Sequence, residues 1–254
     1  MKVLVEHHQL VIPGDLLATG NQLRRGEGCY REKKGDEYHF YAERIGLAEV
    51  HGQTLTVVPL EGRYIPREGD IVIGKITNVG LTSWRVDIRT VIEAVLTASN
   101  VVQRQVDPLR TDISRYLALG DYIKAKVIAY DRTRDPLLTM HGDQRCRKLS
   151  RGRLVEIDAV KVPRVIGKKG SMISLIKRKT RSRLFVGQNG RILIQAPTLE
   201  LELINLEALL KIQNESHTSG LTNRIEQFLN EKIAQLKELE KENDKATLIK
   251  DEEL

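Results

Sequence analysis

The spacing of apolar residues changes along the chain and divides it into parts of different structure. As far as about residue 142, apolar residues fall in short runs separated by glycine-containing turns, which is typical of β-strands. Beyond residue 150, Met172, Leu175 and Ile176 lie at the spacing of one helix face. The pattern therefore predicts β modules followed by a mixed α+β module, and 254 residues suffice for each to bury its own core.

Residues 1–64 predict an all-β module. Turns are expected at Pro13-Gly14-Asp15, Gly26-Glu27-Gly28 and Lys34-Gly35-Asp36. Short strands are expected at residues 2–5, 10–12, 38–42, 45–50 and 54–59. The periodicity does not indicate what this module binds.

Residues 65–144 predict a five-stranded barrel of the OB type, a fold whose face and loops commonly bind nucleic acid strands. Its strands are expected at residues 70–77, 84–88, 91–96 and 122–130, with Gly69-Asp70 and Gly120-Asp121 before the first and last. Trp84 has the same strand parity as Val86 and Ile88. We therefore expect Trp84 in the barrel core instead of on a base-stacking surface.

The last expected strand of the barrel has two different faces. The alternation places Ile123, Ala125 and Val127 on one side and Tyr122, Lys124 and Lys126 on the other. An aromatic ring beside two ammonium groups is suited to stacking a base and holding phosphates. The same pattern equally fits a barrel strand with ordinary solvated lysines, so both interpretations stay open.

Residues 150–216 predict a module with the element order βααββα. A first strand is expected at 155–162, a helix at 171–180, strands at 183–186 and 191–195, and a final helix from the capping residue Thr198 to Lys211. Asn189-Gly190 is a strong signal for a turn between the two later strands. Residues 217–254 predict an amphipathic helix followed by a polar tail.

Positive charge is concentrated in this third part. Residues 145–192 contain 15 Lys+Arg and only 2 Asp+Glu, whereas residues 1–144 contain 19 of each and residues 193–254 contain 7 against 13. Such a block repels itself unless a polyanion neutralises it. A solvated, thermally robust surface is the alternative, but the block also contains a phosphate-binding loop pattern, which favours nucleic acid.

That pattern is Ile166-Gly167-Lys168-Lys169-Gly170, directly before the helix that opens at Ser171. Gly167 and Gly170 allow the backbone to approach a sugar-phosphate chain closely, and the amides of the helix N-terminus favour an anion. Lys168, Lys169 and the preceding Arg164 add charge without reading a base. The surrounding elements match the type I KH domain, whose GxxG loop clamps a four-nucleotide single strand, although a tight structural turn would produce the same residues.

Several other classes of protein are disfavoured. Cys29 and Cys146 lie far apart and the six histidines are scattered, so neither a disulfide framework nor a metal site is expected. No apolar run reaches the roughly 20 residues of a membrane span, and the first residues lack a signal-peptide pattern. We expect a cytoplasmic protein without a cofactor and without a membrane partner.

The combined order of modules resembles a known family. Residues 68–141, with 68–76 and 119–129 as the matching stretches, resemble an S1-type RNA-binding OB domain. The β module, S1-type barrel and single KH domain follow one another as in the archaeal exosome cap subunit that carries a KH domain. Further matches are Val11-Ile12-Pro13-Gly14-Asp15, Arg25-Gly26-Glu27-Gly28-Cys29-Tyr30 and the GxNG turn Gly187-Gln188-Asn189-Gly190. The resemblance covers about residues 5–230.

This resemblance implies a non-catalytic subunit of a trimeric cap on a hexameric ring of ribonuclease-PH-like subunits. The N-terminal module would dock on the ring, alone in the cap or together with another cap protein. The S1-type barrels would surround the entry pore and deliver single-stranded RNA, with a preference for adenine-rich 3′ ends, to phosphorolytic 3′ to 5′ degradation. The GxNG turn would be structural. The candidate RNA contacts are Gly167, Lys168, Lys169, Gly170, Arg164, Lys124, Lys126, Tyr122 and, by loop position alone, Arg104 and Arg110.

Two rival interpretations remain. Polynucleotide phosphorylase also contains KH and S1-type domains, but in the opposite order and behind catalytic cores that exceed this length, and no catalytic motif is present here. A transcription antitermination or ribosome-associated factor can place an S1-type barrel before KH. Such transcription factors usually carry two KH domains, and too little chain follows Ser216 for a second one.

Overall fold

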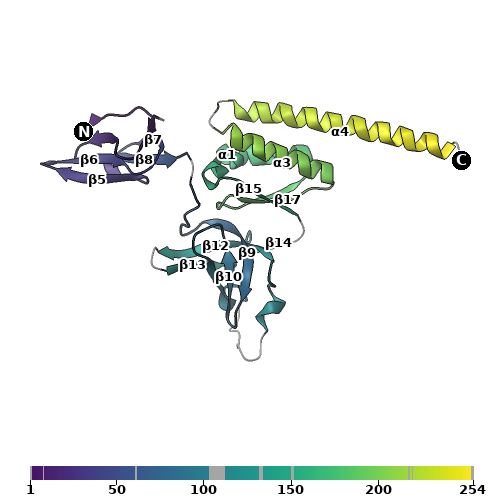
Figure 1. The fold of residues 1–254 in the computed structure, drawn as a ribbon, viewed down its shortest axis with the longest axis horizontal. Helices are drawn as coiled ribbons and strands as arrows, with labels where there is room; N and C mark the ends of the chain where they lie inside the picture. Colours follow the sequence, from purple (N-terminus) through teal and green to yellow (C-terminus); the bar gives the residue numbers. More distant parts are fainter. Residues whose placement is uncertain are drawn as a thin grey trace. The chain divides into compact units, whose positions relative to one another are not determined.

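A computed structural model describes residues 2–7, 9–60, 62–102, 112–131, 134–149, 152–216, 218 and 220–252, with the side chains of 237 and 239–252 outside that description. The chain divides into two compact units, residues 1–62 and residues 63–254 (Figure 1). No described helix is long and apolar enough to cross a membrane. The fold is mostly β, as predicted, and its helices lie in the second unit.

The first unit consists of two four-stranded sheets. One has the order β1 (Lys2–Val3), β3 (Leu16–Thr19), β6 (Glu37–Ala42), β5 (Cys29–Lys34), and the other β2 (Leu10–Val11), β7 (Gly46–His51), β8 (Thr54–Pro59), β4 (Arg24–Arg25). Leu17, Phe40 and Leu55 are completely buried in its core. The pattern did not predict β5, because only its first residue is buried and its other side chains are exposed, so no apolar alternation marks it.

A closed five-stranded barrel opens the second unit. Its strands are β9 (Ile71–Val79), β10 (Ser83–Asp87), β11 (Ala94–Thr97), β12 (Tyr122–Asp131) and β13 (Arg134–Thr139), and pairing of β12 with both β9 and β13 closes it. A short strand, β14 (Arg147–Leu149), extends the sheet beside β12. Trp84 is fully buried and its Nε1 donates to the Leu117 carbonyl oxygen at 2.9 Å, so its predicted core position is confirmed.

Two barrel strands differ from the prediction. The strand expected at 91–96 begins only at Ala94, because Val91 and Ile92 lie exposed in the preceding turn. The pattern also failed to predict β13, which contains Pro136. Proline cannot donate to a ladder and argues against a strand, but the β12–β13 register shifts at this position, so no hydrogen bond from Pro136 is needed.

The KH module has the predicted βααββα order. It consists of β15 (Arg153–Glu156), α1 (Val162–Ile166), α2 (Ser171–Thr180), β16 (Arg183–Val186), β17 (Arg191–Gln195) and α3 (Leu199–Asn214), with the antiparallel sheet order β15-β17-β16. The strand expected at 155–162 was wrong in its second half. A 3₁₀ turn (Ala159–Lys161) and α1 replace it, because Pro163 in the first helical turn is preorganised for a helix.

The last helix, α4 (Leu221–Glu252), packs along α2 and α3 (Figure 1). Leu221, Ile225 and Leu229 are buried against these helices, as expected of an amphipathic helix. The helix continues to Glu252, through the residues predicted to form the polar tail. The stretch is rich in Glu and Lys, which have high helix propensity without needing a buried face.

The barrel and the KH module share a core within the second unit. Ile73 of β9 and Leu149 of β14 pack with Leu193 of β17. Leu154 and Phe185 of the KH sheet and Tyr122 of the barrel pack around them. One face of the KH sheet is therefore covered by its own helices and the other meets the outside of the barrel.

Candidate nucleic-acid interface

The glycine loop between α1 and α2 has the backbone conformation that its sequence requires. Gly167, Lys169 and Gly170 have φ angles of 74°, 53° and 79°. A Cβ on Gly167 would lie 2.8 Å from the backbone nitrogen of Met172, so a side chain does not fit there. The loop therefore brings its backbone close to the first turn of α2, where amide groups favour an anion.

The loop lies in a stretch without acidic residues. Between Asp158 and Glu200 the sequence has no Asp or Glu but ten Lys+Arg. Most of these cations have no ion pair among the described residues, namely Arg164, Lys168, Lys169, Lys177, Arg178, Arg181 and Arg183. All seven are exposed. Arg164, Lys168 and Lys169 lie at the glycine loop itself. Uncompensated cations at such a loop suit a polyanion, and their contacts would position a strand without reading bases.

The structure brings five of the predicted contacts together at this loop. Gly167, Lys168, Lys169 and Gly170 form it, and Arg164 lies on the last turn of α1 before it. The others come from a different element. Tyr122, Lys124 and Lys126 lie on β12, whereas Arg104 and Arg110 are outside the described residues.

The outer face of β12 is less open than the alternation suggested. Tyr122 packs against the cluster that joins the barrel to the KH sheet. The Nζ atom of Lys124 lies 5.8 Å from the ring centre of Phe185 in β16. Burial lowers the pKa of Lys124, and the nearby charges of Arg145 and Lys177 lower it further. This face of the barrel is thus a boundary with the KH module as well as a cationic surface.

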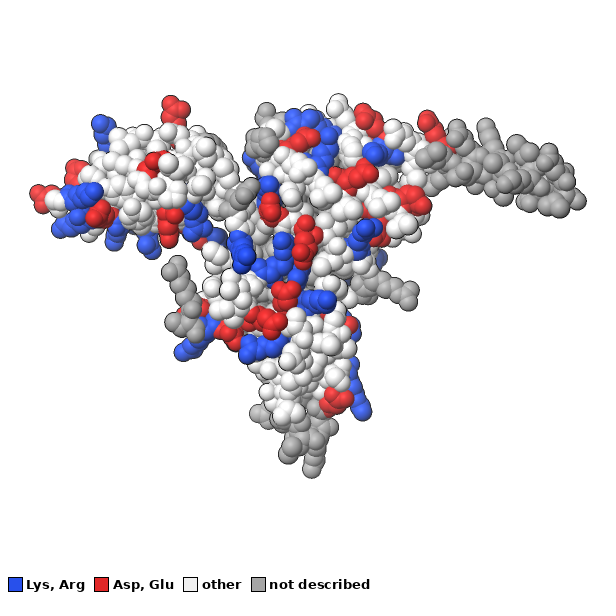
Figure 2. Space-filling model, in the orientation of Figure 1, with Lys and Arg blue, Asp and Glu red and all other residues white. Residues whose placement is uncertain are grey.

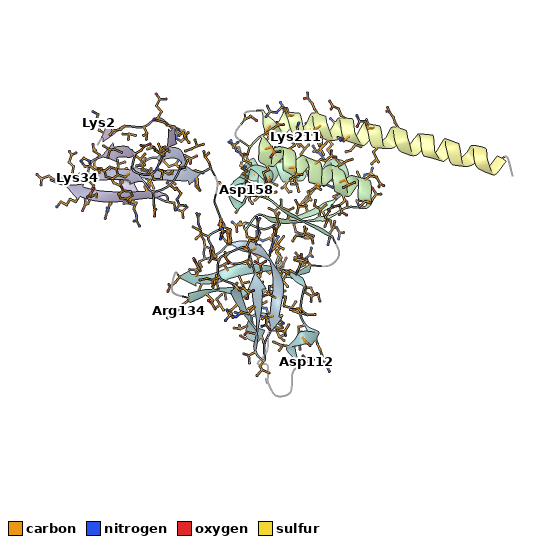
Figure 3. The ribbon with its side chains drawn as sticks, in the orientation of Figure 1. Lys2, Lys34, Asp112, Arg134, Asp158 and Lys211 are labelled. Atoms are coloured by element: carbon orange, nitrogen blue, oxygen red, sulfur yellow. The ribbon has the colours of Figure 1, made fainter. Side chains whose placement is uncertain are left out.

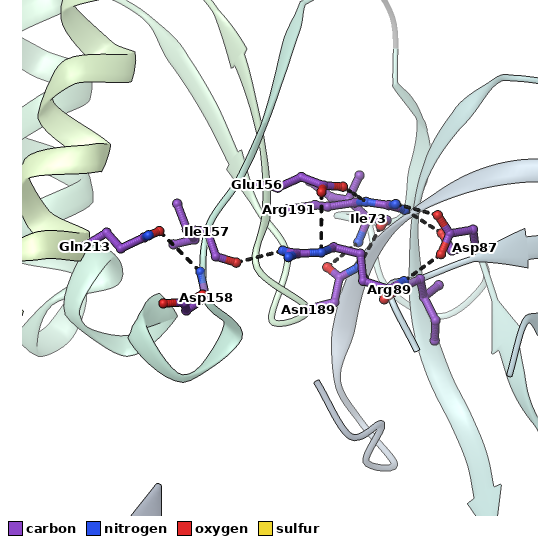
Figure 4. Close-up of polar contacts among 10 residues, drawn as sticks. Ile73, Asp87, Arg89, Glu156, Ile157, Asp158, Asn189, Arg191 and Gln213 are labelled. Atoms are coloured by element: carbon purple, nitrogen blue, oxygen red, sulfur yellow. Dashed lines mark hydrogen bonds and ion pairs between the residues drawn. The ribbon is translucent and has the colours of Figure 1, made fainter. Parts of the chain in front are cut away.

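The GxNG turn lies inside that boundary (Figure 4). Asn189 is completely buried, and its Nδ2 donates to the carbonyl oxygens of Ile73 at 2.8 Å and Ile88 at 3.0 Å. Its Oδ1 accepts from the Ile73 amide at 3.2 Å. A Cβ on Gly187 would lie 2.8 Å from the same amide nitrogen. The turn therefore attaches the KH module to β9 of the barrel, and this attachment explains why Gly187 and Asn189 occupy these positions.

A second set of polar contacts supports the same boundary. Arg191 is only 5% exposed and donates to Glu156 Oε1 at 2.9 Å and to the Asp87 carbonyl oxygen at 2.6 Å. Arg89 of the barrel donates to the Ile157 carbonyl oxygen at 2.7 Å (Figure 4). Figure 2 shows blue and red side chains alternating where the barrel meets the KH module. The cations in this region form contacts that hold the two modules together, in contrast to those around the glycine loop.

Sequence reasoning missed two residues of the boundary. Arg147 and Phe185 come from β14 and β16, and the Cζ atom of Arg147 lies 4.9 Å from the Phe185 ring centre. Lys177 of α2 is close enough for its charge to lower the pKa of Lys124. The basic run from Arg145 to Lys148 was visible in the sequence, but nothing there indicated that it pairs with β12.

Nothing in the described part of the chain suggests a metal or cofactor site. No group of three His, Cys, Asp or Glu side chains there is placed to hold a metal ion. The arrangement instead combines an exposed glycine loop, uncompensated cations and a barrel that shares a core with the loop's module. These features can bind a flexible polyanion.

Comparisons with known proteins agree with the three modules. Family models match at residues 8–61 (exosome RNA binding protein RRP4 N-terminal domain), 63–129 (RRP4, S1 domain) and 153–201 (KH domain). The exosome complex component Rrp4 of Pyrococcus furiosus is 43% identical over 93% of this chain and 88% of its own length. The Rrp4 component of Sulfurisphaera tokodaii is 42% identical over 97% of this chain and 96% of its own length. A crystal structure of an exosome complex RNA-binding protein has 44% identity and a TM-score of 0.63, and the match covers 68% of this chain and 98% of that one.

Proposed function

We infer the function from one premise: this chain belongs to the Rrp4 family of exosome complex components. We propose that it is a non-catalytic RNA-binding cap subunit. It gathers single-stranded RNA, with a preference for adenine-rich 3′ ends, and delivers it to a ribonuclease-PH-like ring for phosphorolytic 3′ to 5′ degradation. The observation that carries the RNA-binding part is the open glycine loop within a stretch that has ten cations and no carboxylate.

The N-terminal unit is the proposed attachment to the ring. Leu10, Ile12 and Ile45 are each more than half exposed. They lie on or next to the paired strands β2 and β7, where Val11 pairs with Gly46. Exposed apolar residues gathered on one surface mark protein interaction sites, which supports docking through this unit. We further propose that three copies bind each ring, alone or mixed with another cap protein, and that the protein is cytoplasmic.

The RNA contact of the glycine loop is tested by reversing its charges. We expect Lys168→Glu together with Lys169→Glu to weaken binding of a fluorescent single-stranded RNA to the full chain. Each exposed ion pair contributes up to about 1 kcal/mol, so the loss should reach roughly 30-fold. Fluorescence anisotropy at several salt concentrations measures this change.

A matched control carries the same charge change away from the loop. Lys33→Glu with Lys34→Glu alters the exposed end of β5 in the other unit (Figure 3) and should leave the affinity within about twofold, because neither lysine belongs to the loop and Lys34 already pairs with Glu32. Equal affinity of the loop variant and the wild type would contradict the role of the loop. Purified chain should also leave labelled RNA intact in phosphate and magnesium, since the catalytic step is proposed to belong to the ring.

A further inference from the structure

Two cations oppose each other where the barrel meets the KH module. Lys124 of β12 and Arg147 of β14 are direct partners in the antiparallel ladder. Like charges directly opposite across two strands destabilise a sheet. Both cations also approach one ring, that of Phe185, at 5.8 Å and 4.9 Å. Neither forms an ion pair with any described carboxylate, so their mutual repulsion is not relieved in that way within the described chain.

The neighbouring groups do not supply the missing negative charge. Arg145 and Lys177 both act on Lys124 as further positive charges. Asp143 is close enough to affect Lys124, but its carboxylate is bound by Arg145 Nη2 at 2.6 Å and Nε at 2.9 Å. Cys146 is the other nearby acidic group, and burial raises the pKa of its thiol, which keeps it neutral. The local balance therefore stays positive.

The face of Phe185 explains how the cations are held without an acid. An aromatic face attracts a cation through its quadrupole, and Phe185 contributes this surface from β16. Attraction by one ring orients Lys124 and Arg147 together but cancels neither charge. Lys177 is exposed on α2, the helix that starts directly after the glycine loop. Because an α-helix rises 1.5 Å per residue, Lys177 lies about 10 Å further along the helix axis than Gly170.

We propose that Lys124, Arg147 and Lys177 form a phosphate-binding site, the seam site, for the sugar-phosphate backbone of single-stranded RNA, with Phe185 as the positioning residue. The inference rests on the proposed function and adds a path, because the strand would leave the glycine loop, follow α2 and cross onto the barrel at the seam. Phosphate contacts do not read bases, so the seam site would bind any single strand. It would join two modules that sequence reasoning treated as separate binding surfaces.

The test neutralises the two exposed members of the seam site in the full chain. Arg147→Gln with Lys177→Gln should reduce the affinity for a fluorescent single-stranded RNA at least tenfold. Each phosphate contact contributes about 0.7 to the slope of log K against log salt for single strands, so this slope should fall by about 1.4. Lys177→Gln alone, which cannot disturb β14, should lower it by about 0.7.

A control with the same loss of two charges uses cations that already have partners. Lys148 pairs with Asp121 and Arg85 pairs with Asp135, both at 2.5 Å. Lys148→Gln with Arg85→Gln should keep the affinity within about twofold and leave the slope unchanged, because compensated cations release few counterions. Arg147→Lys, which keeps the charge, should also keep the slope.

The outcomes separate the seam site from the proposed function. If the seam variants bind RNA with the affinity and salt slope of the wild type while Lys168→Glu with Lys169→Glu weakens binding, the seam site is wrong and the proposed function stands. If the seam variants instead lose an acidic protein partner but keep RNA binding, the seam site for RNA is equally wrong. A wild-type chain that binds no single-stranded RNA overturns both.

Discussion

Asn189 shows how much one buried amide can hold in place. It is fully buried and satisfies three backbone groups of the barrel, two on Ile73 of β9 and one on Ile88 directly after β10, with its Nδ2 donating twice and its Oδ1 accepting once. An unsatisfied buried polar group costs about 1 to 3 kcal/mol. The contribution of Asn189 therefore depends on its being an amide, with a donor and an acceptor on one side chain.

We expect Asn189→Asp to lower the free energy of unfolding of the 63–254 unit by about 3 kcal/mol. The aspartate keeps the shape and the acceptor but loses the two donated bonds, and its charge faces two carbonyl oxygens. Urea denaturation followed by Trp84 fluorescence measures the change, since Trp84 is the one tryptophan of the chain.

Gln188→Glu is the matched control for that measurement. The exposed Gln188 uses only its Oε1, which accepts from the Ile71 amide at 2.6 Å, so a carboxylate can replace it. We expect a change within about 0.5 kcal/mol, as is usual at the surface. An equal effect of both substitutions would show that the amide donors of Asn189 contribute nothing.

At the scale of elements, predictability depended on whether a segment carries its own signal. The spacing of apolar residues gave α2, β16 and β17 with their observed bounds, because α2 has one buried face and the two strands are short apolar segments joined by the Asn189-Gly190 turn. It failed for β3, β4, β5, β13 and β14, which are strands mainly because a neighbour pairs with them. β5 is polar, β13 contains a proline and β14 has only three residues, so none of these three has a periodicity from which it could be predicted.

The exposed apolar residues beside β2 and β7 carry a prediction about assembly. Ile12→Asp with Ile45→Asp should reduce co-purification with ribonuclease-PH-like ring subunits at least tenfold, because burying a carboxylate in an apolar interface is costly. Leu199→Asp on α3, which is also more than half exposed, should have no effect. Retention of the double variant by the ring would place the docking surface elsewhere on the chain.

At the scale of the whole molecule, the barrel and the KH module of the 63–254 unit depend on each other. Their shared apolar cluster is small, and Arg191 reinforces it by bonding Glu156 of the KH module and Asp87 of the barrel. Burial opposes ionisation of Asp87, but the hydrogen bonds and charge of Arg191 outweigh it and hold the pKa of Asp87 below its ordinary 3.8. The coupling between the modules is therefore partly electrostatic.

We expect Arg191→Ala to lower the free energy of unfolding of this unit by about 2 kcal/mol at neutral pH. This is less than for a fully buried pair, because the side chains of Asp87 and Glu156 are 36% and 47% exposed and water screens them. A carboxyl with a lowered folded pKa stabilises the fold above its unfolded pKa and loses this effect as the pH falls. The difference between wild type and variant should therefore shrink below pH 3.8. A difference that is the same at pH 7 and pH 3 would contradict the role of Asp87.

The sequence alone was enough to predict the order of modules, the barrel core around Trp84, the helix after the glycine loop and the concentration of positive charge. These features are local, because periodicity, turn residues and charge act between residues close in the chain. Packing between distant segments places Tyr122 and Lys124 at a boundary instead of on a free face, sets Arg147 opposite Lys124 and bonds the GxNG turn to β9. Each depends on residues about 20 to 120 positions apart, and side-chain pairing over such separations leaves no periodic trace in one sequence.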